Sequence, residues 1–195
     1  MTVVDLEPAA RRLAELIANL PDDRLGGPTP CPDYSLADLV EHVGGLSLAF
    51  AAAAAKELGP MTGPARAGDG SRLPDDWRTR IPRQLATMAE AWREPAAWEG
   101  MTRAGGIDLP GGVAGVVALD ELVVHGWDVA RASGQDFDCE PAALEAVHGF
   151  VAQVAAAGPQ PGLFGAAVEV PESAPLLDRV IGLAGRDPSW TSPNW

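Results

Sequence analysis

The chain has 195 residues, 47% of them hydrophobic, which suits one domain with a sizeable core and does not fit a disordered chain. The formal net charge of −13 argues against a nucleic-acid groove or an anionic membrane surface, because both need clustered lysine and arginine. We therefore expect neither nucleic acid nor membrane as a partner, although the charge does not identify the partner.

The N-terminus and the cysteines bear on localisation. The first twenty residues carry acids early and lack the basic-then-apolar order of a signal peptide. The apolar run LSLAFAAAAA, residues 46–55, is too short to span a bilayer. Cys31 and Cys139 do not form a secreted disulfide framework. We predict a cytoplasmic monomer or homodimer with both thiols reduced and unpaired.

Two amphipathic helices are predicted in the N-terminal part. Residues 5–20 place apolar side chains at helical spacing, and residues 21–34 are too rich in Pro and Gly to continue the helix. Ser35 is a good N-cap, with Asp38 three residues later approximating a capping box. The helix that follows is expected to end near residue 58. The apolar face of the first helix consists of Leu6, Leu13, Leu16, Ile17 and Leu20.

Three more helices are predicted before the C-terminal part. The third runs from residue 77 or 78 to 93, or begins later, because Pro82 is tolerated only in a first turn. Residues 98–110 are irregular, with a strand or two. The fourth helix extends from Gly111 or Gly112 to Ser133–Gly134, and the fifth covers residues 141–156.

The last 35 residues differ from the rest. LFGAAVEVP, residues 163–171, alternates weakly and predicts a short strand. Residues 174–185 predict a short helix that stops at Gly185, and an irregular tail with two tryptophans follows. The fold class is therefore mainly all-α: an antiparallel four-helix bundle with short C-terminal strand and helix additions. We expect residues 1–195 to form a single domain, with about 160–195 as an extension packed on it.

The segment LDELVVHGWD, residues 119–128, carries three polar groups in a helix that is otherwise apolar almost all round. Glu121, His125 and Asp128 lie at i, i+4 and i+7 and share one face. A glutamate and a histidine one turn apart can bind one divalent ion. A buried acid–imidazole hydrogen bond explains the pair equally well.

A metal site needs a third ligand, and the chain has only three histidines. His42 shares a helix face with Leu39 and Leu46, so it can point into the bundle and complete a two-histidine, one-carboxylate set. The alternative interpretation of His42 is a hydrogen-bonded histidine in the core. For His148 a structural or surface role is favoured.

Other residues near these positions have more than one interpretation each. Asp128 could be a charge on the helix surface. With a metal present, it could instead accept a hydrogen bond from the ring N–H of a ligand histidine, or contact the substrate. Arg131 could meet an anionic substrate or be a plain cation in the last helical turn. Cys31 could lie at the mouth of a pocket or be buried as a small hydrophobe.

Three segments carry a family resemblance: TPCPDYSLADLVEHVGG (29–45), LDELVVHGWDVARASGQD (119–136) and PLLDRVIGLAGRDPSW (175–190). Together they resemble the actinobacterial branch of the DinB-like superfamily, whose metal-binding members are related to mycothiol-dependent maleylpyruvate isomerase. The resemblance implies a four-helix bundle around a divalent ion, usually zinc and sometimes nickel, with His42, Glu121 and His125 as ligands. Tyr34 stands where the family often has tryptophan. The chain is shorter than the isomerase and does not obviously supply its second domain.

Two classes of function follow. The first is an enzyme in which mycothiol, activated by the ion, attacks a small electrophilic metabolite in an S-transfer or isomerisation. The second is a non-catalytic module that binds a metal or a small molecule, which a fourth protein ligand closing the site would favour. A metal-dependent hydrolase is a third reading, with bound water as nucleophile and Asp128 as general base.

Overall fold

A computed structural model of the protein describes residues 3–158 and 165–192. This part of the chain is mainly helical, as predicted, and includes one two-stranded antiparallel sheet in which Met101 pairs with Pro110 and Ala104 with Ile107. The elements are α1 (Glu7–Ala18), η1 (Asp22–Arg24), α2 (Leu36–Ala54), η2 (Pro60–Thr62), η3 (Gly70–Arg72), α3 (Trp77–Ala91), α4 (Pro95–Trp98), β1 (Met101–Ala104), β2 (Ile107–Pro110), α5 (Gly111–Ser133), α6 (Pro141–Ala157) and α7 (Leu176–Leu183).

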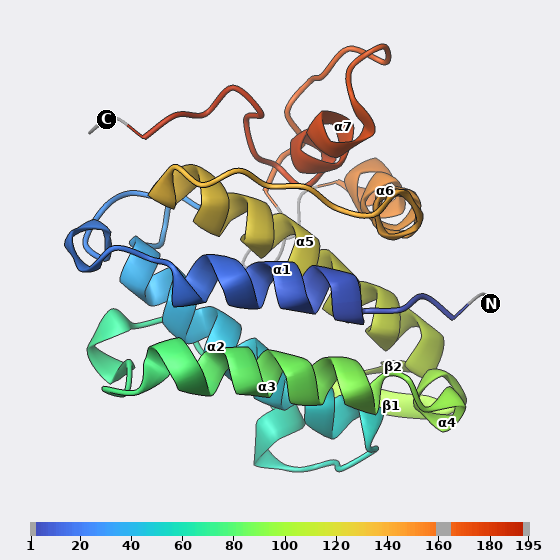
Figure 1. Cartoon of the computed structure of the whole chain (residues 1–195). Coiled ribbons are helices and arrows are strands. Elements are labelled where there is room, and N and C mark those ends of the chain that lie inside the picture. Colours follow the sequence, from blue (N-terminus) through green and yellow to red (C-terminus); the bar gives the residue numbers. More distant parts are fainter. Residues whose placement is uncertain (1–2, 159–164, 193–195) are drawn as a thin grey trace.

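Four helices form the bundle, and α6 and α7 cover it from one side. Helices α1 and α2 each pack on both α3 and α5, which closes a ring of four around the core (Figure 1). Helix α6 packs on α5, and α7 packs on α6. The predicted four-helix bundle is therefore confirmed, with α1, α2, α3 and α5 as its members.

The bundle is not antiparallel throughout, as we had predicted. Gly70, shortly before α3, donates its N–H to Asp38 in the first turn of α2, and Trp92 after α3 donates to the Phe50 carbonyl near the end of α2. Helices α2 and α3 therefore run in parallel. The connection 55–76 is long enough to return along α2, whereas antiparallel neighbours need only a short loop.

Local chemistry explains both ends of α2. Ser35 caps α2, and its side chain and backbone exchange hydrogen bonds with Asp38 in the predicted capping box. Helix α2 ends at Ala54, four residues before the predicted end, and Lys56 turns out with a φ of 60°. Its ammonium group donates to the carbonyls of Ala97 and Glu99, which ties the end of α2 to α4.

Two details of the middle region differ from the prediction. Pro82 lies in the second turn of α3, which begins at Trp77, so the helix tolerates a missing N–H there. The short helix α4 was not predicted; it lies just before the region expected to be irregular and shares only Trp98 with it. The hairpin of β1 and β2, the start of α5 at Gly111 and its stop at Gly134, with a φ of 74°, are as predicted.

The C-terminal strand is not formed in the described residues 165–171. Val168 donates its N–H to the Gly182 carbonyl, and a Cβ on Gly182 would lie 2.4 Å from Val170. This segment therefore packs along α7 instead of pairing with a strand. Helix α7 and its stop at Gly185 are as predicted. Residues 163–164 of the predicted strand and the second tail tryptophan, at position 195, lie outside the described residues.

Helix α2 contains the apolar run 46–55 up to Ala54, and it begins ten residues before that run, at Leu36. By length and composition alone, its 19 residues could cross a membrane. A buried helix of a soluble bundle meets the same criterion, and α2 packs against α3 and α5.

Candidate metal centre

The centre is built on α5, the most deeply buried helix of the bundle. Its alanine, valine and leucine residues favour burial on nearly every face, so the polar groups it carries must find partners inside the protein. Asp128 is fully buried and His125 nearly so, while the side chain of Glu121 is 27% exposed. Glu121 therefore has the most exposed side chain of the three.

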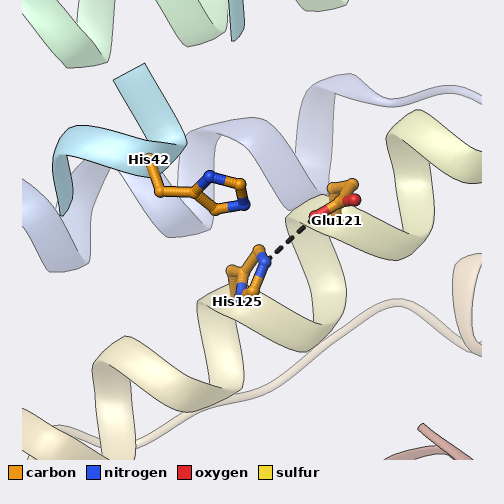
Figure 2. A group of neighbouring side chains, drawn as sticks. All are labelled: His42, Glu121 and His125. Carbon is orange, nitrogen blue, oxygen red and sulfur yellow. Dashed lines mark ion pairs between the residues drawn. The ribbon is translucent and has the colours of Figure 1, made fainter. Parts of the chain in front are cut away.

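His42 of α2 faces Glu121 and His125 of α5, and the ligand atoms of the three side chains all lie within 4.8 Å of one another (Figure 2). The Nε2 atom of His125 is 3.0 Å from the Oε2 atom of Glu121. The rings of His42 and His125 meet edge to face, with centroids 5.2 Å apart. The three side chains that the sequence singled out as candidate ligands therefore lie together, and their binding of a metal stays a prediction.

The other nitrogen of His125 faces away from this cluster. Its Nδ1 lies 3.0 Å from Oδ2 of Asp128, and the same oxygen accepts a 3.2 Å hydrogen bond from Nη2 of Arg186. A carboxylate at Nδ1 fixes the orientation of the ring and leaves Nε2 for the cluster. Asp128 is thus the neighbour of a candidate ligand, and its interpretation as a surface charge is wrong.

The electrostatics follow from burial and from these contacts. Burial, with the nearby charge of His125, lowers the pKa of His42 to about 4, so this imidazole is neutral at pH 7. Burial opposes a charge on His125, but hydrogen bonds to Asp128 and Glu121 outweigh it and raise its pKa to about 9. Burial raises the pKa of Asp120 to about 8, which keeps that carboxyl neutral beside Glu121.

A short segment holds His42 from the solvent side. We call residues 67–72 the strap. Its Gly68 N–H donates to the hydroxyl of Tyr34, whose ring lies 5.3 Å from that of His42. Arg72 of the strap pairs with Glu41, which is therefore engaged away from the cluster.

The donor set fits a divalent transition metal. Two imidazoles and one carboxylate suit zinc and also nickel, iron and manganese. Within residues 3–158 and 165–192, the cluster consists of three potential ligands from two helices. A three-ligand set of this kind leaves positions for an exchangeable ligand, unlike a closed structural zinc site.

The remaining candidates lie elsewhere or have other partners. Arg131 donates to the carbonyl of Pro188 and lies over the ring of Trp127, so it ties down the C-terminal tail. His148 contacts Arg179 between α6 and α7, in agreement with a structural role. Cys31 and Cys139 are both free thiols, as predicted.

Sequence reasoning missed Arg186, the cation closest to this chemistry. It follows α7, its guanidinium is 12% exposed, and it lies 58 residues from Asp128 in the chain. Arg186 lies in the segment 175–190, and no spacing pattern in the sequence connects that segment with α5. Tyr34 and the strap were also not assigned to the site.

Comparison with known proteins gives consistent results. The family described as mycothiol maleylpyruvate isomerase N-terminal domain matches residues 6–130. Two uncharacterised proteins from strains of Mycobacterium tuberculosis are 32% identical over 177 residues, covering 89% of this chain and 91% of each relative.

Two crystal structures share the fold. Mycothiol-dependent maleylpyruvate isomerase superposes with a TM-score of 0.64 at 19% identity, covering 93% of this chain and 86% of the enzyme. A histidine-to-alanine mutant of that isomerase gives a TM-score of 0.60 at 18% identity, covering 87% and 75%. At such identities the likeness concerns the fold.

Proposed function

The chain belongs to the mycothiol maleylpyruvate isomerase N-terminal domain family, and we propose that it is a mycothiol-dependent transferase or isomerase that uses a divalent metal ion. The substrate would be a small electrophilic metabolite. The observation that carries this proposal is the convergence of His42, Glu121 and His125, whose ligand atoms lie within 4.8 Å of one another. Zinc is the metal we favour, and the cytoplasm the compartment.

In this proposal the three side chains hold the ion, and Asp128 orients one of them. A bound divalent cation lowers the pKa of a coordinated thiol, so that the thiolate forms near neutral pH. His42 is ready to act as a ligand, because its low pKa leaves the imidazole neutral. His125 must first give up its proton, and its Nδ1 remains hydrogen-bonded to Asp128.

Arg186 adds a positive charge at the edge of the centre. Its guanidinium is paired with Asp128 through Nη2, while its Nε has no hydrogen-bond partner in the described residues although it is buried. A buried N–H without an acceptor favours an anionic or carbonyl-bearing ligand nearby. This supports an electrophile that carries a carboxylate or a carbonyl group.

The hydrolase alternative has less support. Its general base would be Asp128, but that carboxylate lies on the Nδ1 side of His125 and is paired with Arg186. A fully buried carboxylate with these partners is poorly placed to take a proton from water at the cluster. In a non-catalytic protein, the metal ion would have no coordination position open to an exchangeable ligand, and this distinguishes it from the proposed enzyme.

The test is metal analysis followed by thiol titration. Protein purified without a histidine tag should contain about one divalent ion per chain, and His125→Ala should contain almost none. Calorimetric titration of the loaded protein with mycothiol should show saturable binding that His125→Ala abolishes. A loaded protein that binds no thiol would reject the proposed cosubstrate, and a protein without metal affinity would reject the centre itself.

A further inference from the structure

The strap, residues 67–72, lies across α2 at the position of His42. A Cβ added at Gly68 would be 3.1 Å from the Cβ of His42, so the backbone of the strap passes directly over this candidate ligand. The ring of His42 points from α2 toward Glu121 and His125 (Figure 2). The ring of His125 is nearly buried, and an ion that contacts it must therefore first displace some covering segment.

Mainly polar contacts hold the strap on α2. The N–H groups of Asp69 and Gly70 donate to the carboxylates of Glu41 and Asp38, respectively. The six residues of the strap are an alanine, two glycines, an aspartate, a serine and an arginine, so it brings little apolar surface to the contact. Segments with few buried apolar contacts open at a low cost in free energy. The strap is therefore the covering segment that we expect to open most readily.

Arg72 ties the strap to the helix. Its guanidinium binds both carboxylate oxygens of Glu41, and it also donates to the carbonyl of Ala67 at the other end of the strap. The side chain of Arg72 is 32% exposed, so water and salt reach this ion pair. Without Arg72 the hydrogen bond from Gly68 to Tyr34 would remain. The strap would then open more often but would still rest mostly on α2.

Opening of the strap would also free the ring that lies against His42. The hydroxyl of Tyr34 accepts its hydrogen bond from Gly68 of the strap, and the centroids of the Tyr34 and His42 rings are 5.3 Å apart. When the strap lifts, Tyr34 loses this donor. The covering backbone and the neighbouring ring can therefore move together and uncover His42 in one step.

The charges around the strap favour the approach of a cation. Three carboxylates, those of Asp38, Glu41 and Asp69, surround the single guanidinium of Arg72. Negative charge at an entrance raises the local concentration of cations. Near α5 the guanidinium of Arg186 would instead repel a metal ion. The strap side is therefore the better entrance for the ion.

We propose that the strap is a gate for the divalent metal ion, and that Arg72 sets how often this gate opens by binding Glu41. The inference rests on the proposed function, because it needs the metal centre. It gives the strap a kinetic role in metal uptake and release. A gate that covers the empty and the loaded centre alike hinders both directions equally. It therefore changes both rate constants by the same factor and leaves the Kd for zinc unchanged.

The experiment measures zinc kinetics on the wild type and two variants. Stopped-flow mixing of the zinc-loaded protein with excess chelator gives the release rate, and mixing of the metal-free protein with zinc and a fluorescent zinc indicator gives the uptake rate. Arg72→Ala removes the guanidinium of the gate. Arg66→Ala, at an exposed position just before the strap, removes the same charge and is the matched control.

We expect Arg72→Ala to speed uptake and release alike by about tenfold, the effect of losing a charge-assisted hydrogen bond, with no change in the Kd for zinc. Added salt should speed release from the wild type and from Arg66→Ala but not from Arg72→Ala, because salt screens the exposed ion pair. If Arg72→Ala has the same rates as Arg66→Ala, or releases zinc faster without faster uptake, the gate is overturned and the proposed function stands. A wild-type protein that binds no zinc would overturn the proposed function, and the gate with it.

Discussion

Gly68→Ala is the sharpest test of how the fold positions His42. A Cβ at Gly68 would lie 2.3 Å from the carbonyl oxygen of Asp38 and 3.1 Å from the Cβ of His42. The first of these atoms belongs to the backbone of α2 and the second is fixed by it. The strap must therefore move away from the helix, and the Gly68 N–H then loses the hydroxyl of Tyr34.

The magnitude follows from these two changes. Overpacking of a closely fitted contact costs about 1–3 kcal/mol, and the lost hydrogen bond adds about 1 kcal/mol. We expect the free energy of unfolding of the metal-free protein to fall by about 2–4 kcal/mol, the sum of the two. Because Tyr34 and Gly68 both contact His42, we also expect zinc affinity to fall by about tenfold, as when a group supporting a ligand is altered.

Urea unfolding measures the first effect, and competition with a chromogenic chelator measures the second. Gly45→Ala is the control, since a Cβ there meets nothing within 4 Å and the residue lies in the same helix as His42. It should stabilise α2 by up to about 1 kcal/mol and leave zinc affinity unchanged. If Gly68→Ala binds zinc as tightly as Gly45→Ala, the strap does not position His42.

Four further predictions concern the same centre. In the metal-free protein His125 keeps its proton up to about pH 9, so zinc binding at neutral pH should release about one proton. Below that pKa, zinc affinity should increase about tenfold for each unit by which the pH rises. Calorimetry in buffers of different ionisation enthalpy measures the proton release, and a pH-independent zinc affinity would contradict the prediction. Because the pKa of His125 is higher in the folded protein than in the unfolded chain, its protonated ring stabilises the metal-free fold. This contribution to the free energy of unfolding is complete below about pH 6.5 and is lost as the pH rises through 9. Asp128→Asn should still bind zinc, with about 10–100-fold weaker affinity. It should also lose about 3–5 kcal/mol of stability, because Arg186 loses a buried counter-charge. Chelator competition measures the affinity and urea unfolding the stability, and wild-type zinc affinity would argue against an orienting role for Asp128. Cys31→Ser should keep most of the turnover, since burial raises the pKa of that thiol; loss of activity with the metal retained would make Cys31 the nucleophile.

Contacts between residues close in sequence could be predicted from the sequence. Glu121, His125 and Asp128 lie within two turns of one helix, and their common face follows from helical spacing alone. The capping box of Ser35 and Asp38 spans one turn. The inward orientation of His42 followed from its apolar neighbours, although spacing alone left a core histidine as an alternative.

Contacts between distant segments could not be predicted in this way. Arg186 reaches Asp128 from the segment after α7, and the strap reaches α2 over about thirty residues. No periodicity encodes such pairs, because each depends on the path of a connection. The parallel course of α2 and α3 was missed for the same reason: the sequence shows that residues 55–76 form a loop, but not that this loop returns along the helix.

The charges at the centre indicate why an anionic ligand belongs there. In the metal-free protein the carboxylates of Glu121 and Asp128 face a protonated His125 and the guanidinium of Arg186, so two negative charges meet two positive charges. Asp120 adds nothing, since burial raises its pKa to about 8. A divalent cation that replaces the proton of His125 brings one more positive charge than it displaces. In a mostly buried site an uncompensated charge is costly, and an anionic ligand, such as the thiolate of the proposed function, would balance it.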